Sequence, residues 1–368
     1  MSAPHEWPEP APAGWFPDPQ DRLYLRPLLQ DGGRHFDNVE IWARNPAGRV
    51  RMRPMPVRGF VLWLRLLPSA QRQRLQAFFD NLCRPPRTFA GVALNGPAIM
   101  GIVNVTPDSF SDGGMHLRPD EAIAHGRALH AAGAAILDIG GESTRPGAAP
   151  VAEDEERRRI LPVIEGLSGC GAVLSADTRK PGVMRAAVKA GVGIINDVTA
   201  LEYAPDSMQA AAEGNVSVVL MHARGTPENM QDNPEYDHPL LDVFDYLEHR
   251  VAACVAAGMA KTRIAVDPGI GFGKNLAHNM ALMRGLSMFR ALGLPLLLGV
   301  SRKSMIGALG DEPAALRRVP GSLAAAIWGA ANGADILRVH DVAETVQALA
   351  VWRALAGAAM GGTSGQER

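Results

Sequence analysis

Residues 98–114 read AIMGIVNVTPDSFSDGG, and this stretch decides the fold. Its first part, 99–105, is a short apolar run typical of a strand that is buried on both faces. Pro107 then stops ladder pairing, and hydroxyls and carboxylates follow up to the glycine pair at 113–114. Helix-like sequence resumes at Pro119. The stretch therefore predicts a buried strand, a polar loop and a helix, in that order.

The same unit recurs along the rest of the chain. Apolar strand candidates lie at 99–103, 135–139, 172–176, 192–195, 216–221, 263–266, 295–299 and 335–339. Helical candidates lie between them at 119–132, 153–167, 180–190, 204–213, 240–258, 275–292, 320–332 and 341–356. Strict alternation at this spacing predicts parallel βα units, and eight of them in about 260 residues fit a closed (β/α)₈ TIM barrel. The alternative, an open doubly wound sheet, requires a glycine fingerprint after the first strand, and no G-x-G-x-x-G follows there.

Composition narrows the class of protein. The formal net charge of -1 argues against nucleic-acid or membrane binding by the chain as a whole. The sequence has neither a signal-peptide pattern at its start nor an apolar run of about 18 residues for a membrane span. Three scattered cysteines, without C-x-x-C spacing, do not suggest a disulfide framework. We expect a cytoplasmic protein.

The first 95 residues differ from the rest. Residues 1–20 contain six prolines and are expected to form a flexible tail. Residues 21–95 form a small Arg-rich extension, for which we predict a strand at 57–67 and an amphipathic helix at 70–82. Its basic residues are a solvated face, a packing surface on the main domain or a site for an acidic partner, and the sequence leaves its role open. The main domain is expected at 96–358, followed by a disordered tail at 359–368.

All eight predicted strands end in polar residues, and in a barrel these ends share one mouth, where ligands bind. A single such ending is commonplace, because Asp and Asn also cap helices, but eight at one mouth indicate a site. One set suits a flat nitrogen heterocycle, since carboxylates accept N–H bonds and an ammonium meets a ring carbonyl: Asp177, Asn196, Asp267 and Lys303. A second set suits an anion such as a diphosphate: Asn104, Arg145, Arg338 and His340.

Five motifs resemble those of the dihydropteroate synthases, the folate-pathway enzymes that sulfonamides inhibit. They read NVTPDSFSDGG, DIGGESTRPGA, DPGIGFGKN, GVSRKS and RVHD, in the order and spacing of that family, over residues 97–356. The resemblance implies a (β/α)₈ barrel, a homodimer and Mg²⁺. It also implies a reaction that joins 4-aminobenzoate to (7,8-dihydropterin-6-yl)methyl diphosphate, with release of pyrophosphate and 7,8-dihydropteroate.

The resemblance also implies residue roles. The pterin would be bound by Asp177, Asn196, Met221, Asp267, Lys303 and Arg338. The diphosphate would be bound by Asn104, Thr144, Arg145, Arg338 and His340, with Asn104 also on the metal. The aminobenzoate pocket would be shaped by Pro146, Phe272, Ser301 and Lys303. The catalytic group would be Asn104, Asp108, Arg145, Lys303, Arg338 and His340, and Asp108 is a candidate for stabilising a cationic intermediate. The family's mechanism is dissociative and needs no dedicated base.

Two other functions remain open at this stage. A pterin-dependent methyltransferase module uses a similar barrel, but it is usually joined to a corrinoid domain with D-x-H-x-x-G, which is absent from this sequence. A pterin-binding barrel without catalysis is disfavoured by the intact motifs. Several polar residues are interpreted as structural: His222 as a packed histidine, Arg179 and Lys180 as a helix start, and His238, His249 and His278 as surface residues. The glycines at 269–273 lack Walker spacing and indicate close backbone packing.

Overall fold

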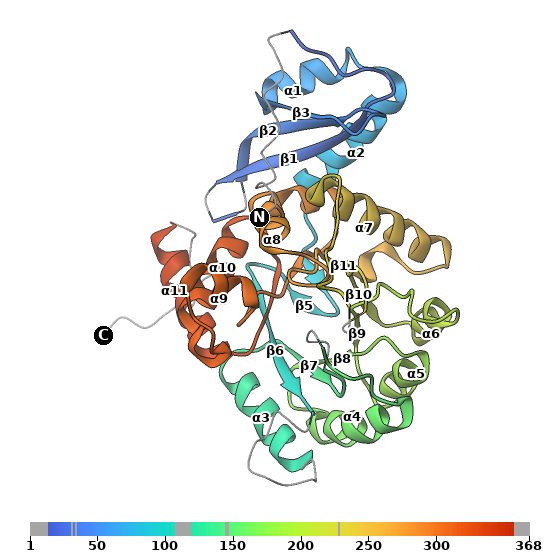
Figure 1. Cartoon of the computed structure of the whole chain (residues 1–368), viewed down its shortest axis with the longest axis vertical. Helices are drawn as coiled ribbons and strands as arrows, with labels where there is room; N and C mark the ends of the chain where they lie inside the picture. The colour runs from blue at the N-terminus through green and yellow to red at the C-terminus, as the bar shows by residue number, and fades with distance from the viewer. Residues whose placement is uncertain are drawn as a thin grey trace.

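The structure is a computed structural model that describes residues 14–30, 32–33, 35–106, 119–143, 147–226 and 229–356. Eight strands form one parallel sheet in the order β11-β10-β9-β8-β7-β6-β13-β12. They are β6 (Ala98–Asn104), β7 (Ile136–Gly140), β8 (Val173–Asp177), β9 (Ile194–Asp197), β10 (Ser217–Met221), β11 (Ile264–Asp267), β12 (Leu297–Leu298) and β13 (Ile336–Val339). A parallel bridge between Val266 and Leu296 joins the two ends of this order, so the predicted barrel is confirmed (Figure 1).

Helices connect the strands and surround the barrel (Figure 1). They are α3 (Pro119–Ala131), α4 (Glu153–Leu167), α5 (Pro181–Lys189), α6 (Ser207–Gly214), α7 (Pro239–Ala256), α8 (Leu276–Arg284), α9 (Ser304–Gly310), α10 (Val319–Ala331) and α11 (Val342–Leu355). Short 3₁₀ turns lie at η2 (Lys261–Arg263), η3 (Leu286–Leu292) and η4 (Ala315–Arg317). The predicted alternation of strands and helices is confirmed except between β12 and β13, where α9, which was not predicted, precedes α10.

Two predicted boundaries around β12 were wrong. The helix expected at 275–292 is divided at Gly285 into α8 and η3. A Cβ at Gly285 would lie 2.2 Å from Leu240 Cδ2, so glycine at this position allows close packing against α7. The strand expected at 295–299 is only two residues long, because Pro295 has no N–H to donate and Gly299 adds no side chain to pack.

The N-terminal extension forms an antiparallel sheet with two helices. Its strands, in the order β1-β2-β3, are β1 (Arg22–Gln30), β2 (His35–Arg44) and β3 (Val50–Pro56). Its helices are α1 (Val57–Leu64) and α2 (Ser69–Cys83). The predicted strand at 57–67 was therefore wrong, since Phe60, Trp63 and Leu64 are buried at helical spacing. A continuous apolar run does not by itself distinguish a strand from a helix.

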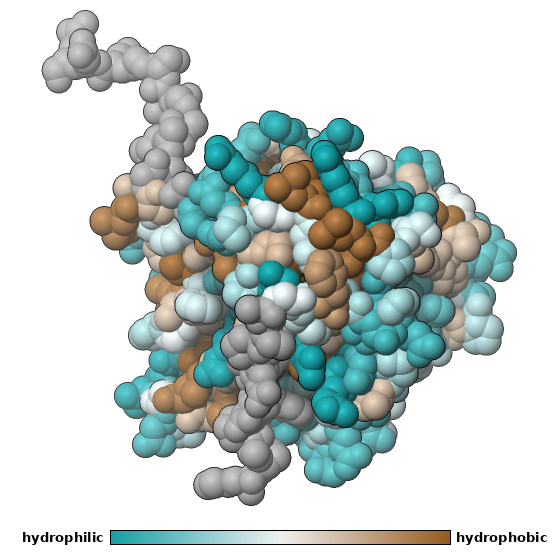
Figure 2. All heavy atoms as spheres, turned by 90° about the horizontal axis from the view of Figure 1, so that it is seen from above, coloured by the Kyte–Doolittle hydropathy of each residue, from teal (hydrophilic) through white to brown (hydrophobic). Residues whose placement is uncertain are grey.

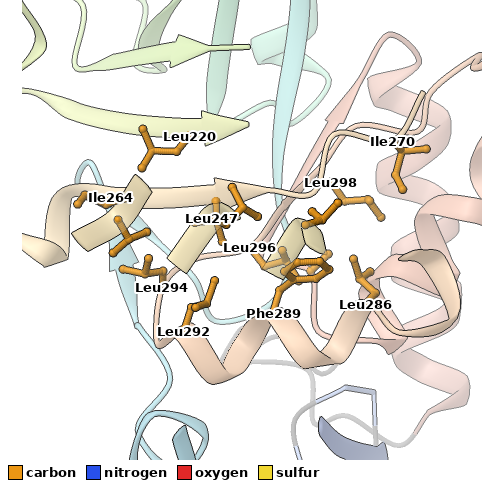
Figure 3. Packing of buried hydrophobic residues seen from close by; sticks show 14 of the residues in the cluster. Leu220, Leu247, Ile264, Ile270, Leu286, Phe289, Leu292, Leu294, Leu296 and Leu298 are labelled. Atoms are coloured by element: carbon orange, nitrogen blue, oxygen red, sulfur yellow. The ribbon is translucent and has the colours of Figure 1, made fainter. Parts of the chain in front are cut away.

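The extension packs along α7 and η3 on one side of the barrel (Figure 1). Phe244 of α7 lies at the centre of this contact, with its ring 5.6 Å from Tyr24 and 5.6 Å from Phe78, measured between centroids. On its other side it contacts Phe289 of η3, which packs among buried leucines beside strand β11 (Figure 3). Helix α7 is apolar around more of its circumference than a surface helix, because the extension and the barrel cover opposite sides of it.

A short hairpin at the end of the extension fills the amino-terminal mouth of the barrel. Its strands are β4 (Thr88–Phe89) and β5 (Val92–Ala93). Phe89 is 1% exposed and packs with the first inward-facing residues of the barrel strands, which include Met100, Ile136 and Ile336. The hairpin thus closes the end of the barrel opposite to the predicted site.

The outer face of the extension mixes hydrophobic and hydrophilic surface (Figure 2). Among its exposed large apolar side chains, Leu62 and Leu66 are 63% and 68% accessible. No helix in the described ranges is long and apolar enough to cross a membrane.

Candidate active site

Arg338 of β13 bonds directly to carboxylates on two other strands and is linked to a third strand through one of them. Its Nε donates to Oδ2 of Asp138 on β7 at 2.6 Å, and its Nη2 donates to Oδ2 of Asp177 on β8 at 2.7 Å. Asn196 of β9 donates from Nδ2 to the same Asp138 oxygen at 2.9 Å. Side chains from four strands therefore share one polar network inside the carboxyl-terminal mouth.

Asp138 is the centre of this network, although the sequence analysis gave it no role. Its side chain is fully buried, and Oδ1 accepts a 2.6 Å bond from Ser175 Oγ. A buried carboxylate is rarely retained in an apolar strand without a cationic or hydrogen-bonding partner. The strand sequence ILDIG has one acidic residue in the middle of a buried strand, and this pattern could have identified Asp138 as a site residue.

Two carboxylates share the single guanidinium of Arg338. Burial raises the pKa of Asp177 to about 7, Arg338 opposes the rise, and the neighbouring Asp138 carboxylate adds to it. Burial would lower the pKa of Arg338, but the two carboxylates outweigh it and hold that pKa above the ordinary value. The network is therefore short of positive charge, which favours ligand groups that donate N–H bonds to Asp177.

Asp267 and Lys303 form the other half of the mouth. Asp267 ends β11 and accepts a 2.7 Å bond from the Gly269 backbone N–H. Burial raises its pKa to about 6, while this bond and the Lys303 charge oppose the rise. Burial lowers the pKa of Lys303 to about 8, although Asp267 opposes the fall. The Lys303 ammonium also lies 4.0 Å from the centroid of the Phe272 ring, a cation–π contact.

A hydrogen bond connects the turns that follow β12 and β13. Ser301 Oγ lies 3.0 Å from Nδ1 of His340, and the His340 backbone N–H donates to the same hydroxyl at 3.2 Å. Arg302, whose φ is +58°, donates from Nε to Oδ2 of Asp341 at 3.0 Å. These contacts fix His340 beside the Lys303 turn.

Of the remaining predicted site residues, the structure describes some and not others. Asn104 is half-buried at the carboxyl end of β6 and pairs through its backbone with Gly140. Met221 is 4% exposed at the end of β10. Four predicted site residues lie outside the described residues: Asp108, Thr144, Arg145 and Pro146.

The glycines of the β11–α8 loop approach neighbouring backbone, as the sequence predicted. Gly269 has φ +68°, and a Cβ there would lie 1.9 Å from the His222 carbonyl oxygen. Gly273 has φ +64°, and its Cβ would lie 2.3 Å from the Arg224 carbonyl oxygen. Only glycine fits both conditions. The loop after β11 therefore lies directly against the loop after β10.

The structure corrects the interpretation of His278 and adds to that of Lys180. The placement of His278 on the surface was wrong: it is 4% exposed, forms the α8 capping box with Asn275 and packs on Tyr236. Lys180 does precede α5, but its side chain is buried, with Nζ 3.1 Å from Glu142 and in a further ion pair with Glu156. This buried ion cluster anchors the base of the loop after β7.

The comparisons with known proteins agree with this geometry. The family model described as "Pterin binding enzyme" matches residues 100–340. The dihydropteroate synthase of Escherichia coli K12 is 49% identical over 259 residues, which cover 70% of this chain and 91% of the relative. The Xanthomonas albilineans dihydropteroate synthase structure with 4-aminobenzoic acid is 50% identical, with a TM-score of 0.70, and covers 75% of this chain and 100% of that one. The same enzyme in complex with 7,8-dihydropteroate is 47% identical, with a TM-score of 0.67, over 73% and 97% of the two chains.

The closed barrel carries carboxylates, an amide and two cations at its mouth. Together with the family match, this places the chain among the pterin-binding enzymes. The chain is also about half identical to dihydropteroate synthases over nearly their whole length, which defines its family within the pterin-binding enzymes. The chain belongs to the dihydropteroate synthases, which are transferases.

Proposed function

We propose that this chain condenses 4-aminobenzoate with (7,8-dihydropterin-6-yl)methyl diphosphate and releases 7,8-dihydropteroate and pyrophosphate by a dissociative, magnesium-assisted substitution. The observation that carries the proposal is the convergence of Asp177, Asn196, Asp267 and Lys303 around Arg338. The proposal is supported by the aminobenzoate and dihydropteroate bound in the Xanthomonas relatives.

In this proposal the pterin binds between the two halves of the mouth. Its 2-amino group and ring N–H donate to carboxylates, of which Asp177 and Asp267 are the candidates. The Lys303 ammonium meets the ring carbonyl or a ring nitrogen. Arg338 keeps both of its carboxylate partners oriented, so the site is arranged before the substrate arrives and loses less conformational entropy on binding.

The diphosphate takes the side of the mouth that carries His340 and Asn104. Mg²⁺ favours oxygen ligands and usually keeps substrate phosphates and waters among them, so one protein oxygen suffices. The Asn104 side-chain amide fits, since it is half-buried at the end of β6 and no other described residue bonds to it. In the described ranges no group of three or more His, Cys, Asp or Glu could hold an ion instead. When bound, the ion would neutralise charge on the leaving diphosphate.

The reaction depends more on charged groups placed near the reacting atoms than on proton transfer by the protein. The bond between the exocyclic methylene carbon and the diphosphate oxygen breaks, and its electron pair leaves with pyrophosphate. The electron-rich pterin then carries the positive charge, next to the carboxylates at the mouth. The aniline nitrogen forms the new C–N bond with its lone pair and afterwards loses one proton to solvent. The nitrogen is a nucleophile without activation, so no dedicated base is needed.

Purified chain with both substrates and MgCl₂ tests the proposal. We expect one pyrophosphate released for each dihydropteroate formed, and loss of turnover on chelation of the metal. Lys303→Ala and Asp177→Ala should abolish turnover, whereas Lys189→Ala, an exposed residue at the end of α5, should not change it. Absence of pyrophosphate release from the folded wild-type chain would rule out the synthase reaction and favour a methyltransferase module or a non-catalytic paralogue.

We propose in addition that the chain forms a homodimer, as the resemblance to the family implies. Light scattering combined with size-exclusion chromatography measures the molar mass directly. A mass near twice 39.2 kDa is expected, and a concentration-independent monomer would contradict the proposal. Placement in the cytoplasm stays a prediction.

A further inference from the structure

Lys274 is a buried cation that the proposed mechanism does not use. It follows the glycine-rich stretch of the β11–α8 loop, and its side chain is 2% exposed. Its Nζ donates to the carbonyl oxygens of Gly269 and Phe272, both at 2.9 Å, and of His222 at 3.2 Å. Nζ also lies 2.9 Å from Nδ1 of His222. None of these four partners is a carboxylate.

These acceptors explain how the cation is tolerated without a counter-ion. Three carbonyl oxygens and one ring nitrogen are one acceptor more than the three hydrogens of an ammonium, so each hydrogen has a partner. Burial lowers the pKa of Lys274 well below its ordinary value, and Asp267 opposes the fall. Burial and the Lys274 charge also lower the pKa of His222, which keeps the ring neutral and leaves Nδ1 able to accept. The arrangement ties two points of one loop to the end of β10.

The same loop has a second tether on its outer side. The Tyr236 hydroxyl, from the β10–α7 loop, donates to the Gly273 carbonyl oxygen at 2.8 Å. Gln231 Nε2 donates to the Gly271 carbonyl oxygen at 2.9 Å. The loop is thus bonded both by Lys274 and by residues of the β10–α7 loop. Its glycines at 269, 271 and 273 are in left-handed conformations.

The residue presented by this loop is Phe272. Lys274 bonds its carbonyl oxygen, and its ring lies against the Lys303 ammonium at 4.0 Å. A Cβ at the neighbouring Gly271 would lie 3.4 Å from Lys303 Cδ, so the loop leaves little room beside this lysine. A shift of the loop by a fraction of an ångström would therefore move the Phe272 ring relative to Lys303. Asp267 and Arg338 stand on strands and would move less.

We propose that Lys274 and Tyr236 are positioning residues for 4-aminobenzoate, which act by holding the Phe272 loop in its binding shape. The inference rests on the proposed function, in which Phe272 and Lys303 form the aminobenzoate pocket. Neither residue touches the substrate in this proposal. Their removal raises the KM for aminobenzoate and leaves pterin binding, which depends on the barrel strands, nearly unchanged.

Two variants test the proposal by steady-state kinetics with each substrate varied in turn. Lys274→Met keeps the length of the side chain and removes its donors, and we expect the KM for aminobenzoate to rise about tenfold or more. Tyr236→Phe removes one hydroxyl, and we expect a rise of two- to fourfold. The KM for the pterin diphosphate should change less than twofold in both. Lys261→Met, at the opposite end of β11, is the matched control and should match wild type.

Calorimetric titration of each protein with the pterin diphosphate alone reports an intact pterin site without turnover. If Lys274→Met does not fold, Tyr236→Phe decides the question, because it leaves the buried cation in place. An unchanged aminobenzoate KM in the folded variants, or an equal rise in both KM values, overturns the proposal. Wild-type chain assayed in parallel separates this result from failure of the synthase reaction, in which wild type itself would release no pyrophosphate.

Discussion

Arg338 and Asp138 are 200 positions apart in the chain, yet their side chains form a 2.6 Å ion pair inside the barrel. The carboxylate is fully buried, and the guanidinium also reaches Asp177. Asp138 does not need to touch the substrate to matter, because it fixes the plane of the arginine that orients a predicted pterin ligand. The pair links the first half of the barrel, which carries β7 and β8, to its last strand.

Asp138→Asn should lower kcat/KM for the pterin diphosphate by about tenfold to a hundredfold. The amide oxygen can still accept from Arg338 and Asn196 if its NH₂ group faces Ser175 Oγ, but the negative charge that pairs with Arg338 is lost. Removing one partner of a buried ion pair costs about 3–5 kcal/mol, part of which will appear as lost stability. Urea unfolding measures that part. Ser175→Ala removes only the Oδ1 bond and is the control, and equal effects in the two variants would refute a special role of the ion pair.

The pH dependence of kcat/KM for the pterin diphosphate should be bell-shaped. Asp177 and Asp267 must be ionised to accept N–H bonds, and burial raises their pKa values to about 7 and about 6, so activity falls as the pH drops through these values. Lys303 must be charged, and burial lowers its pKa to about 8, so activity falls as the pH rises above this value. Lys303→Arg keeps a positive charge and should lose the alkaline limb in whatever turnover remains. A flat profile from pH 5.5 to about 9 would contradict both assignments.

The barrel was predictable from sequence because its signal repeats. Each strand is a short apolar run, and each ends in polar residues, so errors at single boundaries such as 295–299 did not change the topology. The extension lacks such repetition: in 57–67, buried Phe60 and Trp63 alternate with exposed Leu62 and Leu66, and the resulting apolar run matched a strand as well as a helix. Its docking on α7 depends on aromatic residues more than 150 positions away, which no local pattern reveals.

The site was predictable to the extent that it lies at strand ends. Asp177, Asn196 and Asp267 are each within the last two residues of a strand, where a barrel places ligands. Asp138 and Lys274 were assigned no role from the sequence, for a physical reason. One sits within its strand and the other after a glycine loop, and the partners that make them tolerable come from distant segments.

Gly269→Ala should disrupt the β11–α8 loop. A non-glycine residue at positive φ costs about 1–2 kcal/mol, and overpacking adds about 1–3 kcal/mol, so a loss near 3 kcal/mol or more is expected. Gly258→Ala is the matched control, because its φ is +91° and nothing lies within 4 Å of a Cβ there. It should show the conformational cost alone. Urea unfolding measures both, and equal losses would mean that the contact with the His222 carbonyl is not limiting.

Arg74 links the extension to the barrel through a bidentate ion pair. Its Nη1 and Nη2 each donate to a Glu248 oxygen of α7 at 2.9 Å, and its Nε donates to the Leu23 carbonyl oxygen at 2.8 Å. Exposed ion pairs contribute about 0.2–1 kcal/mol, but this one is bidentate, only 25% exposed and part of a network with Arg22. We expect Arg74→Ala to lower the free energy of unfolding by about 1–2 kcal/mol with kcat unchanged. Arg72→Ala, two positions away and exposed, should change it by less than about 0.5 kcal/mol. If the two variants unfold at the same urea concentration, the extension is held by its apolar contacts with Phe244 and not by this ion pair.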